Sequence, residues 1–444
     1  MSAETPLSTE ERLRQLLRHL GIDQAHFVGR AALARDWTGL LTKCPEMFSS
    51  LTVIGGSGDP QTVEHLAAKL LVVAGDQGPN AETVRSAMNR LPGAQLVSLR
   101  DYEILAWSDV ARERTDEVGA AMLQSLARMN PPASRGSAPL REGEGEVAGI
   151  SYRIRGAGPP LVLLPFFLAP SQWEPLVPRL SEQYCTITLG GAALGAVAIL
   201  ESRGRAVGYL HMVRTLLEET QLHPGEAVLE VGCGTGVLDR WLARGTAGAH
   251  RITGVDINPY LLQEARALAR QEGPEGAIEF RDGNAESLPF SDNSFEVTMS
   301  VTVIEEVNAD RMLAEMVRVT KPGGRVAVIA RAIDMPRLMN LSLSAGLKAK
   351  VEAPGGGVAA QGCADASLYR RMHHTGLTRV KMLPQLPAFD RADAEVLDFM
   401  QNSFLPTLSQ EEAREWHTAR AQAEAEGTFF MTWPHHCAVG SKPS

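Results

Sequence analysis

A strand pattern that runs through three closely spaced glycines into a helical pattern places the strongest constraint on this chain. Residues 227–236 read Ala-Val-Leu-Glu-Val-Gly-Cys-Gly-Thr-Gly, and a helical pattern begins at Val237. The apolar run 227–231 predicts a short buried strand. A glycine turn between a strand and a helix brings backbone N–H groups and a helix N-terminus close to a ligand. The stretch therefore predicts a nucleotide-type site on an α/β sheet.

Size and composition limit the class of protein. The chain has 444 residues, which favours two or three domains, and its net charge of −9 argues against a nucleic-acid partner. The longest apolar stretches, 161–170 and 189–200, are too short to span a bilayer, so we expect no membrane partner. The N-terminal residues do not read as a secretory signal. Five scattered cysteines without a C-x-x-C pair suit reduced thiols, and we expect a cytoplasmic protein.

Helical and strand patterns alternate along most of the chain. This alternation predicts an α/β fold with two doubly wound sheets, whose parallel strands are covered by helices. We expect one domain at 1–200, with a Pro/Gly/Ser-rich linker at about 130–146. The second domain is expected at 205–444. Its substrate-side insertions are expected at about 332–365 and 391–427.

The first domain resembles an α/β-hydrolase whose halves are exchanged. Residues 21–47 resemble the nucleophile-elbow region of that family, and 70–76 and 94–107 resemble its later strands. Residues 150–164, followed by Trp173, resemble its opening strands. The family's second half thus comes first, which implies a circularly permuted domain whose original ends are joined by the linker.

The resemblance does not extend to the catalytic residues. The elbow requires a serine in Gly-x-Ser-x-Gly, but Ala31 stands at that position and Leu33 replaces the last glycine. The histidine position falls near Ile104, so nucleophile and base are both missing. We expect a degenerate shell without hydrolase chemistry. Whether it binds substrate, mediates a homodimer or covers the second domain stays open.

Two nucleotide ligands compete for the glycine stretch. A dinucleotide site requires Gly-x-Gly-x-x-Gly, and its third glycine would fall at Val237. Glu230 would also repel a pyrophosphate. S-adenosylmethionine carries no phosphate and has a cationic sulfonium and amino group, which Glu230 can attract. Asp256 lies about 20 residues beyond the last glycine, where an acidic residue meets a ribose. The residues therefore favour S-adenosylmethionine.

The stretch 227–331 resembles class I S-adenosylmethionine-dependent methyltransferases, in the broad group that includes the ubiquinone/menaquinone C-methyltransferases. Several motifs occur in the family's order, and Asn284 stands where the family usually has Asp. The resemblance implies a Rossmann-like domain and S-adenosylmethionine as cofactor. We expect no metal, because no Cys or Asp spacing supports one. The residues that it assigns to the cofactor are Glu230, Gly232, Cys233, Gly234, Gly236, Asp256, Ile257, Asn284, Ala285, Ser300 and Val301.

The tail, residues 332–444, is expected to hold the substrate side. Segments 428–433 and 437–440 are predicted to form the last strand, antiparallel as in the family. Four aromatic residues either line the acceptor pocket or fill the core of a helical lid. These are Phe389, Phe404, Trp416 and Trp433.

The catalytic residues are not identified by the sequence. His435, His436 and His374 are weak candidates for a general base, and each occurs in an adjacent pair that could equally lie at the surface. Adjacent residues do not face one way on a strand or helix, so a shared metal site is not expected. Cys363 and Cys437 are best read as inert buried thiols.

These observations predict a methyltransferase that acts on a small-molecule acceptor by in-line displacement at the sulfonium. One alternative is a non-catalytic S-adenosylmethionine sensor or scaffold that recruits a partner through the hydrolase-like domain. Another is a hydrolase with a non-standard nucleophile. A dehydrogenase ranks last because of Glu230 and Val237.

Overall fold

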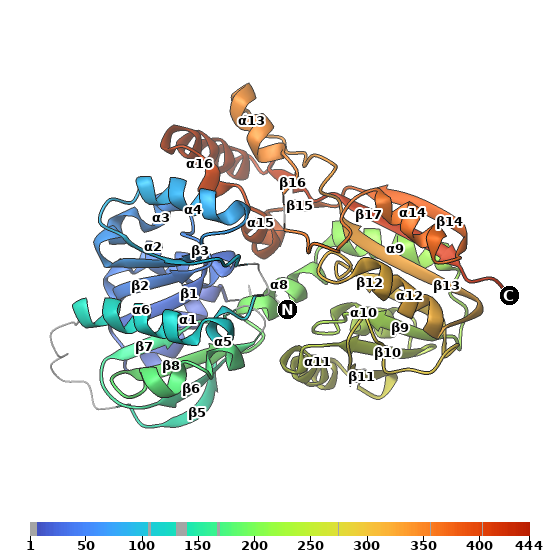
Figure 1. Ribbon diagram of the computed structural model, residues 1–444, viewed down its shortest axis with the longest axis horizontal. Helices are drawn as coiled ribbons and strands as arrows, with labels where there is room; N and C mark the ends of the chain where they lie inside the picture. Colours follow the sequence, from blue (N-terminus) through green and yellow to red (C-terminus); the bar gives the residue numbers. More distant parts are fainter. Residues whose placement is uncertain are drawn as a thin grey trace. The chain divides into compact units, whose positions relative to one another are not determined.

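The chain folds into two compact units, each built on one large sheet (Figure 1). The computed structural model describes residues 7–104, 108–129, 140–166, 169–273, 275–355, 357–401 and 403–444. Unit 1 comprises Met1–Ile199 and Asp398–Glu415. Unit 2 comprises Leu200–Leu397 and Trp416–Ser444.

In the described part of unit 1, eight strands form one mixed sheet. In spatial order they are β4 (Gln95–Leu99), β3 (Leu70–Gly75), β2 (Phe48–Ile54), β1 (Ala25–Arg30), β7 (Pro160–Leu163), β8 (Cys185–Gly190), β6 (Ile150–Arg155) and β5 (Gly143–Val147). The six strands from β4 to β8 run parallel. β6 is antiparallel to β8, and β5 is antiparallel to β6.

The chain enters this sheet at its centre. β1 pairs with β2 on one side and with β7, from far along the sequence, on the other. The first four strands then proceed to one edge, and β5 starts again at the opposite edge. A strand order of this kind is what an exchange of two halves requires, although the hydrolase-like assignment itself stays a prediction.

The linker expectation needs one correction. Residues 143–147 form β5, although the expected linker was about 130–146. The sequence Gly-Glu-Gly-Glu-Val lacks an apolar face because β5 is an edge strand with one neighbour and largely exposed side chains. The linker residues 130–139 lie outside the described part of the chain.

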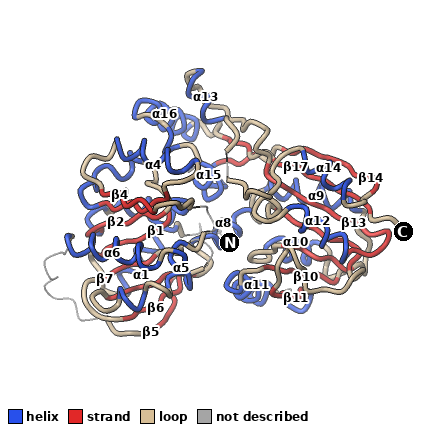
Figure 2. The backbone as a smooth tube through the Cα atoms, in the orientation of Figure 1, coloured by secondary structure: helices blue, strands red, loops and turns tan. Residues whose placement is uncertain are grey.

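Helices cover both faces of the first sheet (Figure 2). Neighbouring residues of β1 point to opposite faces, since Phe27 belongs to a core with α1 and α2 and Val28 to a core with α5, α6 and α7. The helices are α1 (Thr9–His19), α2 (Arg35–Lys43), α3 (Pro60–Val63), α4 (Pro79–Asn89), α5 (Val110–Glu113), α6 (Thr115–Arg128) and α7 (Val177–Leu180), with 3-10 turns η1 (Ala31–Leu33), η2 (Pro45–Met47), η3 (Glu64–Lys69) and η4 (Pro170–Trp173).

A segment near the C-terminus belongs to unit 1. Residues 398–415 were expected within the insertion 391–427 of the second domain, but their contacts place them with the N-terminal residues. Arg90 on α4 donates to the carbonyl of Leu408, and Gln61 Nε2 donates to Gln410 O at 3.4 Å. An amphipathic pattern shows that a helix packs one face against other residues, but it does not show to which unit those residues belong.

The described part of unit 2 contains a seven-stranded sheet. In spatial order its strands are β11 (Ile278–Asp282), β10 (Arg251–Asp256), β9 (Ala227–Val231), β12 (Phe295–Val301), β13 (Thr320–Arg331), β17 (His435–Ser441) and β14 (Thr378–Gln385). The first five are parallel, so their carboxyl ends share one edge. β17 is antiparallel to both neighbours, and therefore begins at that same edge.

The predicted last strand is confirmed as antiparallel at 437–440, but 428–433 takes another role. β16 (Phe430–Thr432) pairs with β15 (Ala388–Asp390) in a separate two-stranded ladder. Pro434 separates β16 from β17 in the sequence, and a proline cannot donate a ladder hydrogen bond.

The remaining helices and turns lie in unit 2, except that η7, the start of α8, the end of α15 and the start of α16 belong to unit 1. They are α8 (Gly195–Arg203), which contains the unit boundary, α9 (Val207–Thr220), α10 (Val237–Gly245), α11 (Pro259–Glu272), α12 (Ala309–Val319), α13 (Ala345–Glu352), α14 (Ser367–His374), α15 (Ala394–Gln401) and α16 (Gln410–Ala425), with 3-10 turns η5 (Glu275–Ala277), η6 (Arg391–Asp393) and η7 (Leu405–Thr407). Among the described residues, no helix combines the length and apolar character that a bilayer span requires.

A buried histidine in β1 makes the stability of unit 1 sensitive to acid. His26 Nδ1 lies 2.7 Å from Ser50 Oγ, and burial lowers the pKa of His26 to about 4. Because this folded-state pKa lies below the unfolded value of about 6.5, the stabilisation is complete above pH 6.5 and is lost as pH falls towards 4. We expect unit 1 to lose about 2 kcal/mol between pH 7 and pH 5 through this group.

Urea unfolding at pH 7, 6 and 5 measures this loss. His26→Gln should remove most of the pH slope of the unit 1 transition, whereas His65→Gln, at an exposed position, should keep it. An unchanged slope in His26→Gln would contradict the prediction.

Candidate functional site

The glycine loop after β9 lies so close to neighbouring side chains, in a left-handed backbone conformation, that it favours glycine. Gly232, Gly234 and Gly236 have φ values of +75°, +56° and +67°. A Cβ added to Gly232 would lie 2.2 Å from Cγ2 of Val303, in the segment that follows β12. The N–H groups of Gly232 and Cys233 both donate to Val255 O, at 2.7 and 3.0 Å. The loop is thereby fixed between β10 and the end of β12.

Asp256 lies beside this loop at the end of β10. Its Oδ2 accepts from the N–H of Gly234 and its Oδ1 from the N–H of Asn258, both at 2.8 Å. Each carboxylate oxygen retains a second lone pair, which suits two ribose hydroxyls. Burial raises the pKa of Asp256 and is the largest influence on it. The next residue, Ile257, is 66% exposed, as expected for an apolar side chain that covers an adenine.

Glu230 presents a buried acceptor at the same edge. Its side chain is 3% exposed, and among the described residues its Oε2 has no hydrogen-bond donor. Burial and the neighbouring carboxyl group of Asp239 raise the pKa of Glu230 well above its usual range. A buried carboxyl without a cationic partner is costly. The cationic amino group of S-adenosylmethionine would supply the missing donor, so the residues present fit this cofactor.

A buried arginine stabilises the glycine loop through a hydrogen bond to its backbone. Arg240 on α10 is 1% exposed and donates to the carbonyl of Thr235 within the loop. It also forms ion pairs with Glu201 at 2.5 Å and with Glu272 at 3.0 Å. These contacts satisfy a charge that burial would otherwise make unfavourable, and they fix the first turn of α10.

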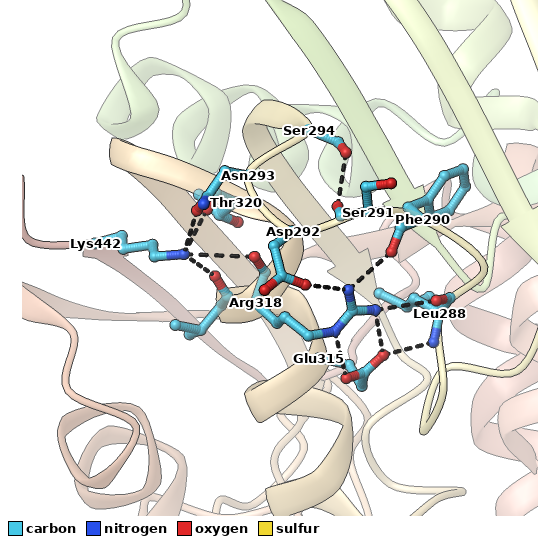
Figure 3. Close-up of polar contacts among 11 residues, drawn as sticks. Leu288, Phe290, Ser291, Asp292, Asn293, Ser294, Glu315, Arg318, Thr320 and Lys442 are labelled. Carbon is cyan, nitrogen blue, oxygen red and sulfur yellow. Dashed lines mark hydrogen bonds and ion pairs between the residues drawn. The ribbon is translucent and has the colours of Figure 1, made fainter.

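A second arginine fixes the loop that follows β11 (Figure 3). Asn284 and Ala285 follow β11, and the loop continues to 292. Arg318 on α12 donates to the carbonyls of Leu288 and Phe290 at 3.0 and 2.8 Å. Glu315 and Asp292 accept from the same guanidinium, and their hydrogen bonds raise the pKa of Arg318.

Asn284 and Ser300 differ in what they can offer a ligand. Asn284 is exposed, and its Oδ1 accepts from the N–H of Glu286 while keeping one lone pair. Ser300 is fully buried, and its hydroxyl donates to Val231 O at 2.8 Å. Ser300 therefore joins β12 to β9 and is not placed to contact a cofactor. Val301 and Cys233 are also buried, with 6% and 5% exposure.

The sequence motif at 300–307 marked the segment after β12, but only Ser300 and Val301 were assigned to the site from it. Thr302 has φ = +56°, which is a strained conformation for a β-branched residue and costs about 1–3 kcal/mol. Its N–H donates to Ile329 O at 2.8 Å, and its hydroxyl accepts from Arg203 Nη1 at 3.2 Å. Strain of this kind concentrates at functional sites.

Two adjacent glutamates follow Thr302. Glu305 is fully buried and accepts from the backbone and side chain of Arg331, yet burial still raises its pKa. Glu306 is accessible to solvent, but surrounding protein desolvates its carboxyl group and raises its pKa to about 7. Among the smaller causes, the charge of Arg203 lowers the pKa of Glu306 and that of Asp256 raises it. In the sequence, the adjacent acidic pair Glu305-Glu306 directly after a predicted strand was the feature that could have indicated these site residues.

The three candidate histidines occupy different environments. His435 is 1% exposed, its Nδ1 lies 2.7 Å from Trp433 O, and burial lowers its pKa to about 3. His436 Nε2 lies 2.6 Å from Asp334 Oδ1. His374 ends α14, just before β14 begins beside Ser441. Since Ser441 pairs with Arg325 near the start of β13, His374 lies near the opposite edge of the sheet from the site.

The four aromatic residues considered for the acceptor pocket also occupy different environments. Phe389 and Trp416 are fully buried core residues, and Phe404 belongs to unit 1. Trp433 stands just before β17 at the carboxyl edge, with its ring 5.3 Å from the Arg203 guanidinium. Among the described residues, no cluster of His, Cys, Asp and Glu is arranged to hold a metal ion.

Comparisons with known proteins match the same segment. Residues 229–328 match the family described as "Methyltransferase domain". The chain is 36% identical over 118 residues to methyltransferase GfsG of Streptomyces halstedii, which covers 26% of this chain and 42% of that protein. It is 35% identical over 117 residues to a ubiquinone/menaquinone biosynthesis C-methyltransferase of Shewanella pealeana, covering 26% and 47%. A demethylmenaquinone methyltransferase of Symbiobacterium thermophilum is 37% identical over 113 residues, covering 25% and 45%.

The matched segment is a class I S-adenosylmethionine-dependent methyltransferase domain, as its motifs predicted. S-adenosylmethionine is the cofactor of this class. The match spans less than half the length of each of these curated relatives.

The Arg318 contacts predict that one side chain stabilises the loop at 284–292. Arg318→Met should lower the free energy of unfolding of unit 2 by about 2 kcal/mol, because it removes hydrogen bonds from two carbonyls and two carboxylates. Thermal unfolding gives the stability, and hydrogen exchange over 284–292 should become faster.

Arg311→Met on the same helix is the matched control. Arg311 is 72% exposed and makes one ion pair of 3.7 Å with Glu286, so its loss should change stability by less than about 0.5 kcal/mol. Equal effects of the two substitutions would refute the assignment.

Proposed function

We propose that this protein is an enzyme whose unit 2 transfers a methyl group from S-adenosylmethionine to a small-molecule acceptor. The observation that supports this most is the arrangement of charge at one sheet edge. The buried acceptor of Glu230 and the loop-bound carboxylate of Asp256 lie on the donor side. Thr302 and Glu306 follow the neighbouring strand β12.

The residues of the donor side have distinct roles in this proposal. Glu230 attracts the amino group, the glycine backbone accommodates the methionyl chain, and Asp256 accepts from the ribose. Ile257 covers the adenine, and Asn284 and Ala285 lie along its edge. S-adenosylmethionine supplies a methyl group made electrophilic by its sulfonium. The chain itself positions the acceptor and excludes water.

Glu306 is the proposed general base where the acceptor must lose a proton. It is accessible, follows the strained Thr302, and has a pKa near neutrality, which suits proton transfer. His435 is a weaker choice because its ring is enclosed in the protein.

Unit 1 is proposed to be a permuted hydrolase-like domain without hydrolase chemistry. Its support is the pairing of β1 with β7 at the centre of the sheet. Residues 29–33 span the end of β1 and the turn after it, where the nucleophile would stand, and none of them has a positive φ. The strained turn that exposes a nucleophile is therefore missing from this described segment, which disfavours the hydrolase alternative.

Isothermal titration with S-adenosylmethionine tests the cofactor site. The intact protein should bind it, and Asp256→Ala should weaken binding about 100-fold, because two charge-assisted hydrogen bonds are lost. Glu279→Gln, an exposed acid on β11, should leave the affinity unchanged within about twofold. No binding at high micromolar cofactor, or equal binding by Asp256→Ala, would exclude the proposal.

The pH dependence of turnover tests Glu306. Labelled S-adenosylmethionine and cell extract first identify the acceptor. A carboxylate base must be deprotonated, so the rate should rise with pH through about 7 and level above about 8. Glu306→Gln should lose this rise and reduce kcat by about 10²–10⁴-fold while S-adenosylmethionine still binds. A variant that keeps both the rate and the pH profile would rule out Glu306, and binding without turnover of any acceptor would favour a sensor.

A further inference from the structure

Arg203, at the end of α8, is held between two aromatic rings in unit 2. Its guanidinium carbon lies 5.3 Å from the ring centroid of Trp433 and 5.9 Å from that of Tyr209. Its Nη1 donates to Thr302 Oγ1 at 3.2 Å. Two cation–π contacts and one hydrogen bond together restrict the guanidinium before any ligand binds.

This cation lacks an anionic partner in the described part of the chain. The hydrogen bond from its Nη1 goes to a neutral hydroxyl, and among the described residues its buried Nε has no acceptor. Arg331 is by contrast paired with Glu305. Half-buried arginines are usually paired, because removing the charge from water is costly.

The position of Arg203 relates it to the reaction site. Thr302, which it contacts, immediately precedes Val303, and Val303 packs against Gly232 of the cofactor loop. The guanidinium therefore stands on the acceptor side of the strand end that borders the cofactor loop.

We propose that Arg203 is an anion subsite that binds a carboxylate of the methyl acceptor, an inference that rests on the proposed methyl transfer. A guanidinium presents parallel N–H groups that match the two oxygens of a carboxylate. One unpaired arginine balances one negative charge, which favours a monoanionic carboxylate over a dianionic phosphate. The flanking rings of Tyr209 and Trp433 add an apolar wall for the body of the acceptor.

The charged groups around Arg203 are consistent with this assignment. Glu306, His435 and Tyr209 are the titratable groups that interact with it. His435 and Tyr209 are neutral near pH 7. Glu306 is not within ion-pair distance of Arg203 in the described structure, so it does not occupy the guanidinium.

Binding of benzoate and of its neutral analogue benzamide tests the subsite. Titrations followed by ligand-detected NMR use the intact protein with S-adenosylhomocysteine. We expect benzoate to bind at least tenfold more tightly than benzamide. Arg203→Met should abolish that preference, and Arg203→Lys should keep part of it, since lysine retains the charge without the planar pair of donors.

Arg205→Met is the matched control, because Arg205 is exposed two residues away and lies 3.9 Å from Glu395. It should retain the full preference for benzoate. Equal binding of the two probes by the intact protein, binding of neither, or a preference that survives in Arg203→Met would overturn the proposal. Two further measurements distinguish this result from failure of the cofactor site. S-adenosylhomocysteine is titrated separately to measure its own affinity, and the benzoate preference is also measured in its absence.

Discussion

The close approach of the glycine loop to the segment after β12 is the constraint on which the second unit depends. Gly232 leaves no room for a side chain because Val303 occupies that space. The same contact brings the donor side, at the ends of β9 and β10, against the acceptor side, after β12. Arg240 then secures the loop from within the protein. Without this packing, Glu230 and Glu306 would belong to separate surfaces.

The site has two halves whose unbalanced charges are of opposite sign. On the donor side, Glu230, Asp239 and Asp256 concentrate negative charge that burial makes unfavourable, which suits a cationic ligand. On the acceptor side, Glu305 is balanced by Arg331, while Arg203 carries a charge that no carboxylate balances in the described structure. A cationic donor and an anionic acceptor would thus be drawn to adjacent positions.

The sequence predicted most of what is local and little of what is distant. The strand, glycine turn and helix at 227–245 were predicted because apolar pattern and glycine spacing act over neighbouring residues. Arg203 and Trp433 could not be connected, since they meet only when β17 joins the sheet. β5 was missed because an edge strand needs no apolar face. The placement of 398–415 in unit 1 depends on tertiary contacts that no periodicity encodes.

The central position of β1 has a consequence for synthesis of the chain. One edge of β1 pairs with β2 as soon as both have emerged, but its other edge waits for β7, whose first residue is Pro160. At about 5–20 residues per second, this interval lasts on the order of 10 s. During that time an apolar strand edge is open to pairing with another nascent chain. Unit 1 is complete only when 398–415 emerges, so its folding finishes after most of unit 2 has been made.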